Sequence, residues 1–399
     1  MKPLEQRIAG AKQKEVFRQI YLHGKVSRQQ LNEEGPLTAS TLTRTLDELA
    51  AGGWIREVGF GESSGGRRPI LYEAEPRRGL LLGLDISRTG ARLVLCDMHL
   101  DPLQTKSWPM RRELTPERLI GEVAACVREW TTAPAYSGEE PLGLGVGAVG
   151  PLRPAEGIIL DPLHFPAPGW ENVPIVRLLE ERLALPVVLD NGANAAIWGE
   201  YLTSEQKFDH LLYVNGGIGL RSASIAGGRI IYGAADTEGS VGQMIIQADG
   251  LPPRDPGGNY GSWESYASIY ALERRATAAV RMGRETSLRE RAPQGEVTFG
   301  LLLEEAARQD ELAQELIREC ATYFGIGLAN LINILHPEKV VLGGPLVTGH
   351  PSFFRIATQV ATRKTYHYPH YVPVFGTSKR EDEAIAVGAA ALLLRKLWS

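Results

Sequence analysis

The sequence of 399 residues predicts an α/β protein with a two-lobed main body that follows a small helical domain. Two observations carry this prediction. Three short helical patterns and a glycine-rich turn occupy residues 1–75, whereas buried strand patterns alternate with amphipathic helices from residue 80 onward. The length suits two to three domains, and an apolar share of 43% is enough to build a sizeable core.

Overall composition excludes several classes of protein. A net charge of −4 is not that of a polybasic nucleic-acid coat. The three cysteines, Cys96, Cys126 and Cys320, are far apart and form no C-x-x-C, so neither a disulfide framework nor a zinc ribbon is expected, and all three are expected to be buried. The sequence contains no long apolar run and starts with polar residues, which predicts a soluble cytoplasmic protein without a membrane span or secretory signal.

The first 75 residues have the element order of a winged helix-turn-helix domain. A helix is expected at 13–23, Ser27–Gln30 is a capping box that begins a second helix, and Thr38 caps a third. Leucines at three- to four-residue spacing give the third helix an inward face: Leu42, Leu46 and Leu49. Two strands, 54–58 and 70–74, then flank the glycine-rich loop 61–69.

Such a domain suits double-stranded DNA. The outward face of the third helix carries short polar groups and one long cation: Ser40, Thr41, Thr43 and Arg44. These side chains can enter a major groove about 12 Å wide and meet base edges or phosphates. Arg67 and Arg68 lie on the glycine-rich loop, where they can contact phosphate or a narrow minor groove. The alternative is a protein-interaction domain whose polar face is only solvated.

The body shows the same strand pattern twice. A hairpin is expected at 80–85 and 91–96, and a second one at 211–215 and 222–225, which suggests two similarly built lobes. Further strands and helices are expected between and after them: strands 142–146, 186–189 and 340–344, and helices 115–130, 176–183, 264–283, 301–333 and 383–397. The segment 145–150 fits G-x-G-x-x-G, but Pro151 and Pro154 follow it where a dinucleotide fold needs a helix. We therefore expect no nicotinamide cofactor.

Several segments in the same order resemble the ROK family of sugar-responsive bacterial repressors and sugar kinases. They are GESSGGRRP at 61–69, WENVP at 170–174, DNGANAA at 190–196, PEKVVLGG at 337–344, and 384–391. The resemblance implies a two-lobed actin-like ATPase (ribonuclease H-like) body with a sugar and nucleotide cleft between the lobes. It places a winged helix-turn-helix domain at 1–75, lobe 1 at 76–200 completed by 380–399, and lobe 2 at 201–379.

The resemblance fails at the positions that do chemistry in the family kinases. Gly192 stands where the resemblance places the carboxylate base of phosphoryl transfer, and Asp190 lies two residues too early to replace it. The first phosphate loop, 85–90, lacks both family glycines and the lysine. Gly217 and Gly219 of the second loop persist, but Arg221 replaces a glycine and either binds phosphate or fills its site. We expect no catalytic residue and no nucleotide cofactor.

The family's zinc and sugar positions are also altered. Gln243 replaces the family histidine and the segment 255–262 has no cysteine, so no metal is expected. Asn191 and Glu264 match positions that hydrogen-bond sugar hydroxyls or support the site, and they are the candidate effector-binding residues. In the alternative interpretation they only satisfy local backbone groups.

Together these features predict a DNA-binding transcriptional regulator, a repressor of carbohydrate-related genes. It would bind a DNA operator as a homodimer or homotetramer and respond to a sugar or another small molecule through a catalytically inactive body. Two other hypotheses remain open at this point: an ATP-dependent sugar kinase with a fused DNA-binding domain, and a constitutive DNA-binding protein with no effector.

Overall fold

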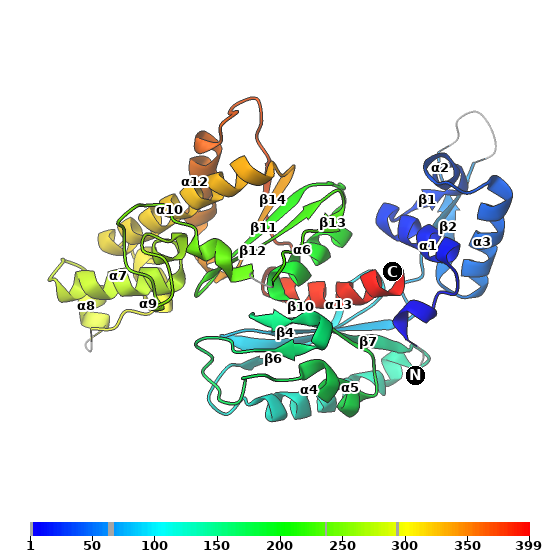
Figure 1. The fold of residues 1–399 in the computed structure, drawn as a ribbon, viewed down its shortest axis with the longest axis horizontal. Coiled ribbons are helices and arrows are strands. Elements are labelled where there is room, and N and C mark those ends of the chain that lie inside the picture. The colour runs from blue at the N-terminus through cyan, green and yellow to red at the C-terminus, as the bar shows by residue number, and fades with distance from the viewer. Residues whose placement is uncertain (1–2, 63–67, 236–237, 293–294) are drawn as a thin grey trace. The chain divides into compact units, whose positions relative to one another are not determined.

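The computed structural model describes residues 3–62, 68–235, 238–292 and 295–399. The chain divides into two compact units (Figure 1). The first unit comprises residues 1–205 and 385–399, and the second comprises residues 206–384. The carboxyl-terminal helix thus belongs with the beginning of the chain. Within the described ranges, no helix is long and apolar enough to cross a lipid bilayer.

Residues 3–75, here called the amino-terminal module, contain three helices and a three-stranded sheet of order β1-β3-β2. The elements are η1 (Leu4–Gln6), α1 (Ala11–His23), β1 (Val26–Ser27), α2 (Arg28–Glu34), α3 (Ala39–Ala51), β2 (Ile55–Phe60) and β3 (Ile70–Ala74). The predicted helix caps are confirmed. Ser27 and Gln30 form a capping box, and the Thr38 side chain accepts a hydrogen bond from the Thr41 amide.

The remainder of the first unit is built on a five-stranded sheet of order β10-β7-β4-β5-β6. Its elements are β4 (Leu80–Ile86), β5 (Gly90–Cys96), β6 (Pro102–Pro109), α4 (Pro116–Thr131), β7 (Pro141–Ala148), β8 (Leu152–Arg153), β9 (Ile158–Ile159), α5 (Ile175–Leu183), β10 (Val187–Asn191), α6 (Gly192–Thr203) and α13 (Ala384–Leu397). Strand β4 is antiparallel to β5 and parallel to β7. Helices α4 and α5 cover one face of the sheet, and α6 and α13 cover the other (Figure 1).

The second unit has a five-stranded sheet of order β13-β12-β11-β14-β15. Its elements are β11 (Leu211–Gly216), β12 (Leu220–Ala226), β13 (Arg229–Ile230), α7 (Ile269–Arg281), α8 (Leu288–Arg291), α9 (Phe299–Ala307), α10 (Glu311–Leu335), β14 (Lys339–Gly343), α11 (Pro345–Thr348), α12 (Pro351–Lys364) and β15 (Val374–Thr377). Strand β11 is antiparallel to β12 and parallel to β14. Both sheets therefore start from a hairpin whose first strand also pairs in parallel with a later strand, as the repeated strand pattern predicts.

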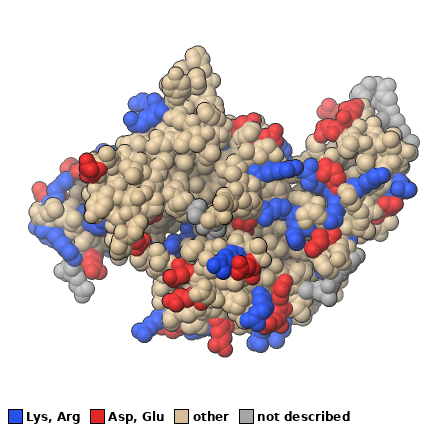
Figure 2. Space-filling model, in the orientation of Figure 1, with Lys and Arg blue, Asp and Glu red and all other residues tan. Residues whose placement is uncertain are grey.

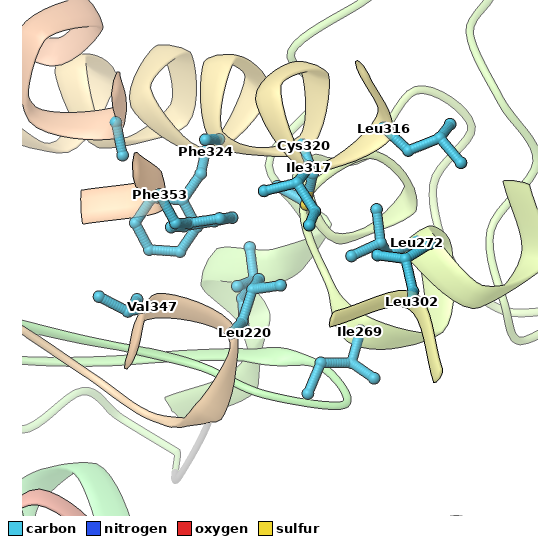
Figure 3. Close-up of a cluster of buried hydrophobic side chains, with 14 of the residues drawn as sticks. Leu220, Ile269, Leu272, Leu302, Leu316, Ile317, Cys320, Phe324, Val347 and Phe353 are labelled. Carbon is cyan, nitrogen blue, oxygen red and sulfur yellow. The ribbon is translucent and has the colours of Figure 1, made fainter. Parts of the chain in front are cut away.

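The core of the second unit is rich in aromatic side chains. Phe324 of α10 packs between Trp263 and Phe353, with ring centroids 5.3 and 5.4 Å apart. Leucine and isoleucine side chains from α7, α9 and α10 belong to the same buried cluster (Figure 3): Leu272, Leu302, Leu316 and Ile317. This cluster holds the helices of the second unit on its sheet.

Two predicted helices differ from the structure. The expected helix 301–333 is two helices, α9 and α10, because Gln309 adopts a left-handed φ of 69° and Asp310 caps α10. Aspartate favours a helix cap over a helix interior, since its side chain competes for backbone amides. The helix expected at 264–283 begins later, where Ser268 caps α7. At 145–150 strand β7 runs on to Ala148, so this segment lacks the helix that a dinucleotide-binding turn requires.

Candidate functional site

The outer face of α3 carries the four candidate DNA-contacting residues. Ser40 and Arg44 are exposed, whereas Thr41 and Thr43 are half-buried. The Thr38 hydroxyl donates to Thr41 Oγ1 at 2.9 Å, and the Thr43 hydroxyl donates to the Ala39 carbonyl at 2.9 Å. The opposite face of α3 is buried in the module. The helix is therefore anchored by its leucines and presents Ser40 and Arg44 most freely.

Arg28 is a residue that the sequence analysis did not single out. It is the first residue of α2, it is exposed, and its Nη1 atom donates to Thr43 Oγ1 at 3.3 Å. A cation thus lies beside the outer face of α3. The signal that could have identified it is its place directly after the Ser27 cap, since backbone amides and a basic side chain at a helix start suit a phosphate.

The loop between β2 and β3 carries the other two candidates. Arg68 is exposed next to the start of β3, and Arg67 lies outside the described residues. Figure 2 shows Lys and Arg side chains interspersed with Asp and Glu side chains over the amino-terminal helices. Contact with a polyanion would therefore depend on particular cations, rather than on a broad positive field.

Asn191 lies at the start of α6, which the sequence analysis did not predict as a helix. Its side chain accepts a hydrogen bond from the Asn194 amide at 2.7 Å and so caps the helix. Asp190 is 2% exposed and is held by three donors: the Asn191 amide and Asn194 Nδ2, both at 2.9 Å, and Arg395 Nη2 at 3.3 Å. Gly192 follows as the first residue of α6 and is buried. The only carboxylate within this turn is engaged in fixing the turn itself.

The β4–β5 turn is closed by its own hydrogen bonds. The Ser87 amide and hydroxyl both donate to the Gly90 carbonyl, at 2.8 and 2.9 Å. Arg88 Nε donates to the Leu163 carbonyl at 2.7 Å and ties the turn to a distant loop of the same unit. The turn is therefore held by its own side chains and by a contact to residue Leu163.

Glu264 of the second unit is held by Gln243. Gln243 Nε2 donates to Glu264 Oε1 at 2.6 Å, and its Oε1 accepts from the Asn259 amide at 2.8 Å. Gly219, in the β11–β12 turn, lies next to this carboxylate: an added Cβ would lie 3.1 Å from Glu264 Oε2, a tight contact to which the Glu264 side chain would have to adjust. The Glu264 residue is half-buried, and its carboxylate lies beside the β11–β12 turn.

Where the resemblance implies zinc ligands, at Gln243 and in the segment 255–262, the chain has no histidine and no cysteine. Both polar atoms of the Gln243 side-chain amide are already hydrogen-bonded, Nε2 to Glu264 and Oε1 to the Asn259 amide. None of Asp255, Gly257 and Ser262 has a thiolate to offer a zinc ion. Over the described part of the chain, no three His, Cys, Asp or Glu side chains form a group that could hold a metal ion. Gln243 instead connects the loop that contains Asn259 to Glu264 through these two hydrogen bonds.

Asn191 and Glu264 lie in different units, Asn191 in the first and Glu264 in the second. Asn191 is linked by hydrogen bonds through Asp190 to Arg395. Glu264 is hydrogen-bonded to Gln243 and lies next to Gly219.

Comparison with known proteins defines the class of this chain. A family model described as the ROK family matches residues 81–396, so the chain belongs to the ROK family. Among curated proteins it is 28% identical over 377 residues to the xylose repressor of Caldicellulosiruptor bescii, covering 94% of this chain and 93% of the relative. It is 26% identical over 384 residues to the DNA-binding transcriptional dual regulator NagC of Escherichia coli, covering 96% and 92%.

Solved structures show the same fold. A ROK family transcriptional regulator, described as a homologue of the E. coli MLC protein, matches with a TM-score of 0.79, covers 98% of this chain and 96% of its own, and is 22% identical. A ROK family glucokinase from Streptomyces griseus, solved with glucose and AMPPNP, matches with a TM-score of 0.65 and is 26% identical. That match covers 79% of this chain and 99% of the glucokinase.

Proposed function

We propose that this chain is a sugar-responsive transcriptional repressor. The observation that carries the proposal is the extent of the match. The xylose repressor aligns with 94% of this chain, whereas the glucokinase structure covers 79% of it. The family model begins at residue 81, so the amino-terminal module is what this chain has in addition to the family domain. A repressor needs such a module to bind an operator, and a kinase does not.

The amino-terminal module acts as a winged helix-turn-helix domain, with α3 as the recognition helix. Ser40, Thr41, Thr43 and Arg44 face the major groove, and Arg28 lies beside them for a phosphate. Arg67 and Arg68 belong to the wing between β2 and β3 and contact the backbone or minor groove. Two modules in a homodimer or homotetramer would bind two DNA half-sites about one helical turn, or a multiple of it, apart.

The remaining chain acts as an actin-like effector body, with one lobe at 76–200 completed by 380–399 and the other at 201–379. Asn191 and Glu264 contribute hydrogen bonds to a sugar. A sugar lowers operator affinity only if it binds better to the conformation that DNA disfavours. The relatives' names supply two sugars to try first, D-xylose and N-acetylglucosamine.

The alternative function, an ATP-dependent sugar kinase, is supported by the similarity to the glucokinase fold. Three features argue against it: Gly192 offers no base, Asp190 is engaged by three donors, and Arg88 closes the β4–β5 turn. A coupled ATP assay over hexoses, pentoses and amino sugars should show no turnover. Turnover that disappears in Asp190→Asn would establish the kinase instead.

The DNA-binding proposal is tested by selecting operator sequences from random duplexes and then measuring affinity at several salt concentrations. Arg68→Ala should weaken all duplexes similarly and reduce the salt slope by about 1. Arg44→Ala should weaken binding and relax sequence preference, by about 1–3 kcal/mol if Arg44 contacts a base. Arg118→Ala, on exposed α4, is the matched control. Selection of no sequence, or equal effects of all three variants, would contradict the proposal.

Effector binding is tested by thermal shift with D-xylose and N-acetylglucosamine. A ligand at 100 times its Kd stabilises the native state by about 2.7 kcal/mol, which raises the melting temperature measurably. Asn191→Ser keeps a cap for α6 but shortens the side chain, so it should reduce the shift without unfolding the helix. If no sugar in a broader panel shifts the melting temperature, the constitutive DNA-binding protein is favoured.

A further inference from the structure

The last turn of α13 packs against the amino-terminal module. The Trp398 ring lies 6.2 Å from the Phe17 ring and 5.4 Å from the Tyr21 ring, both on α1. Lys14 Nζ of the same helix donates to the Ser399 carbonyl at 2.5 Å. Helix α1 in turn packs on α3, the proposed recognition helix. The end of α13 therefore touches the helix that supports the DNA-facing surface.

The same turn of α13 is bound to the start of α6. Arg395 Nη2 lies 3.3 Å from Asp190 Oδ2, and Asp190 is 3% exposed in its side chain. Asp190 also holds the turn that contains Asn191. Arg395 lies in the last turn of α13 and Trp398 follows directly after the helix, so the end of α13 contacts both the candidate effector site and the module.

A second set of contacts joins the bodies of the two helices. Trp198 Nε1 of α6 donates to the Ala391 carbonyl at 3.1 Å, and the Arg395 guanidinium lies 5.9 Å from the Trp198 ring. Where α13 passes α6, a methyl group in place of the Gly388 hydrogen would lie 2.0 Å from the Ala195 carbonyl oxygen. The two helices meet at backbone distance, so neither can shift without displacing the other.

Trp198 also packs within α6. Its ring stacks on Tyr201, with centroids 5.3 Å apart and an interplanar angle of 24°. Helices α6 and α13 thus form one platform, and Trp398 joins the end of this platform to α1.

We propose that this platform couples the effector site to the DNA-binding module, with Arg395 as the positioning residue at the site and Trp398 as the contact that transmits the change. The inference rests on the proposed function, since it assigns the regulation of that function. A sugar that alters the Asn191 turn changes the support of Arg395, the last turn of α13 shifts, and Trp398 repositions α1 and α3. Coupling of this kind is a free energy between two sites, and it is reciprocal.

The first experiment compares operator affinity with and without D-xylose or N-acetylglucosamine, in the full chain and in Trp398→Ala. The sugar-dependent change in operator affinity should fall to less than about twofold in the variant, while sugar affinity measured without DNA is retained. Trp398→Phe, which keeps an aromatic ring, should restore part of the response. Lys396→Ala, on the exposed side of the same turn, is the control and should respond as the parent does. An undiminished response in Trp398→Ala would overturn the proposal.

The second experiment needs neither sugar nor DNA, so its outcome is independent of whether the proposed function holds. Amide hydrogen exchange of residues 11–23 is measured in the full chain, in Arg395→Gln, in Trp398→Ala and in the double variant. Arg395→Gln should speed exchange in α1 when Trp398 is present and add nothing when it is absent. Equal effects in both backgrounds, or none in either, would overturn the coupling. Arg395→Lys should retain parental exchange.

Discussion

The two units bring helices onto their sheets in different ways. In the first unit α13 lies on β4 and β7 at backbone distance, because Gly83 and Gly145 have no side chain to hold it away. In the second unit large rings fill the space between helix and sheet: Phe324 of α10 lies between Trp263 and Phe353, and an added Cβ on Gly216 of β11 would lie 3.2 Å from the Phe324 ring. A helix in backbone contact with a sheet can shift only together with that sheet, whereas side chains in an aromatic core can adjust one at a time. The closer contact lies in the unit that carries the amino-terminal module.

The largest expected effect tests the backbone contact. A Cβ on Gly145 would lie 1.7 Å from the Ala389 carbonyl oxygen, and one on Gly83 would lie 1.9 Å from the Ala386 carbonyl oxygen. Either glycine-to-alanine change should therefore cost more than about 3 kcal/mol of unfolding free energy, the upper end of ordinary overpacking. Denaturant unfolding followed by circular dichroism measures the loss.

The matched control is Gly121→Ala within α4, where an added Cβ meets nothing within 4 Å. That variant should be neutral or more stable by about 0.5–1 kcal/mol, since alanine favours a helix. If Gly145→Ala and Gly121→Ala had similar stabilities, the contrast between the two units would be wrong.

The next effect tests the aromatic core. Phe324→Ala should cost about 3–5 kcal/mol, because it removes a fully buried ring and leaves a cavity beside Trp263 and Phe353. Phe324→Leu should cost less, since neighbouring side chains can fill the smaller gap. The loss of unfolding free energy should appear in the unfolding transition of the second unit. Amide hydrogen exchange in the sheet of the first unit should stay at the parental rate. Equal losses for the alanine and leucine variants would contradict an adjustable core.

A smaller effect is expected in how the stability of each unit depends on pH. Burial raises the pKa of Asp97 in the first unit above its ordinary 3.8, against hydrogen bonds from the Asp101 and His99 amides. Burial also acts to raise the pKa of Asp310 in the second unit, but hydrogen bonds from the Ala313 and Ser287 amides outweigh it, and the pKa is lowered. The two carboxyl groups therefore contribute to stability with opposite pH dependence.

For Asp97 the native state binds its proton more tightly, so its contribution to stability grows as pH falls through the raised pKa. For Asp310 stability is fully present above 3.8 and is lost as pH falls through the lowered pKa. Asp97→Asn should remove a slope above pH 3.8, and Asp310→Asn should remove a slope below pH 3.8, both measured by urea unfolding at each pH. Asparagine still caps α10 through its one oxygen, but its amide nitrogen cannot accept the hydrogen bonds that Thr286 and Ser287 donate to Asp310 Oδ2, so the slopes with pH are compared rather than the absolute stabilities. Slopes of the same sign would refute the assignment.

The smallest effect uses the cysteines as reporters. The sequence analysis expected all three to be buried, but Cys126 is partly exposed, because it lies toward the edge of the face by which α4 packs on the sheet. Burial raises the pKa of Cys320 to about 12. In the native protein a thiol reagent at pH 8 should therefore label Cys126 alone.

Rising denaturant should then expose Cys96 with the first unit and Cys320 with the second. The cysteine that is labelled at the lower denaturant concentration identifies the less stable unit: Cys96 reports on the first unit and Cys320 on the second. Rapid native labelling of Cys320 would contradict the buried core of the second unit.

Local patterns in the sequence predicted much of this molecule. The caps at Ser27 and Thr38, the two hairpins and the closing helix follow from hydrophobic period and from side chains that satisfy neighbouring amides. The break at Asp310 and the whole of α6 were missed. An aspartate can cap or continue a helical pattern, and α6 is apolar on all sides, so it shows no amphipathic period.

The family, most of the elements, and the lack of a carboxylate at Gly192 follow from the sequence alone, since they depend on residue identity and on neighbours close in the chain. The roles of Asp190, Arg88 and Gln243 needed the folded structure, because each has a partner far along the chain, at Arg395, Leu163 and Glu264. The same holds for the packing of the Trp398 ring against Phe17 and Tyr21 of α1. Contacts between distant residues are made by the packing of whole elements, which no local pattern records.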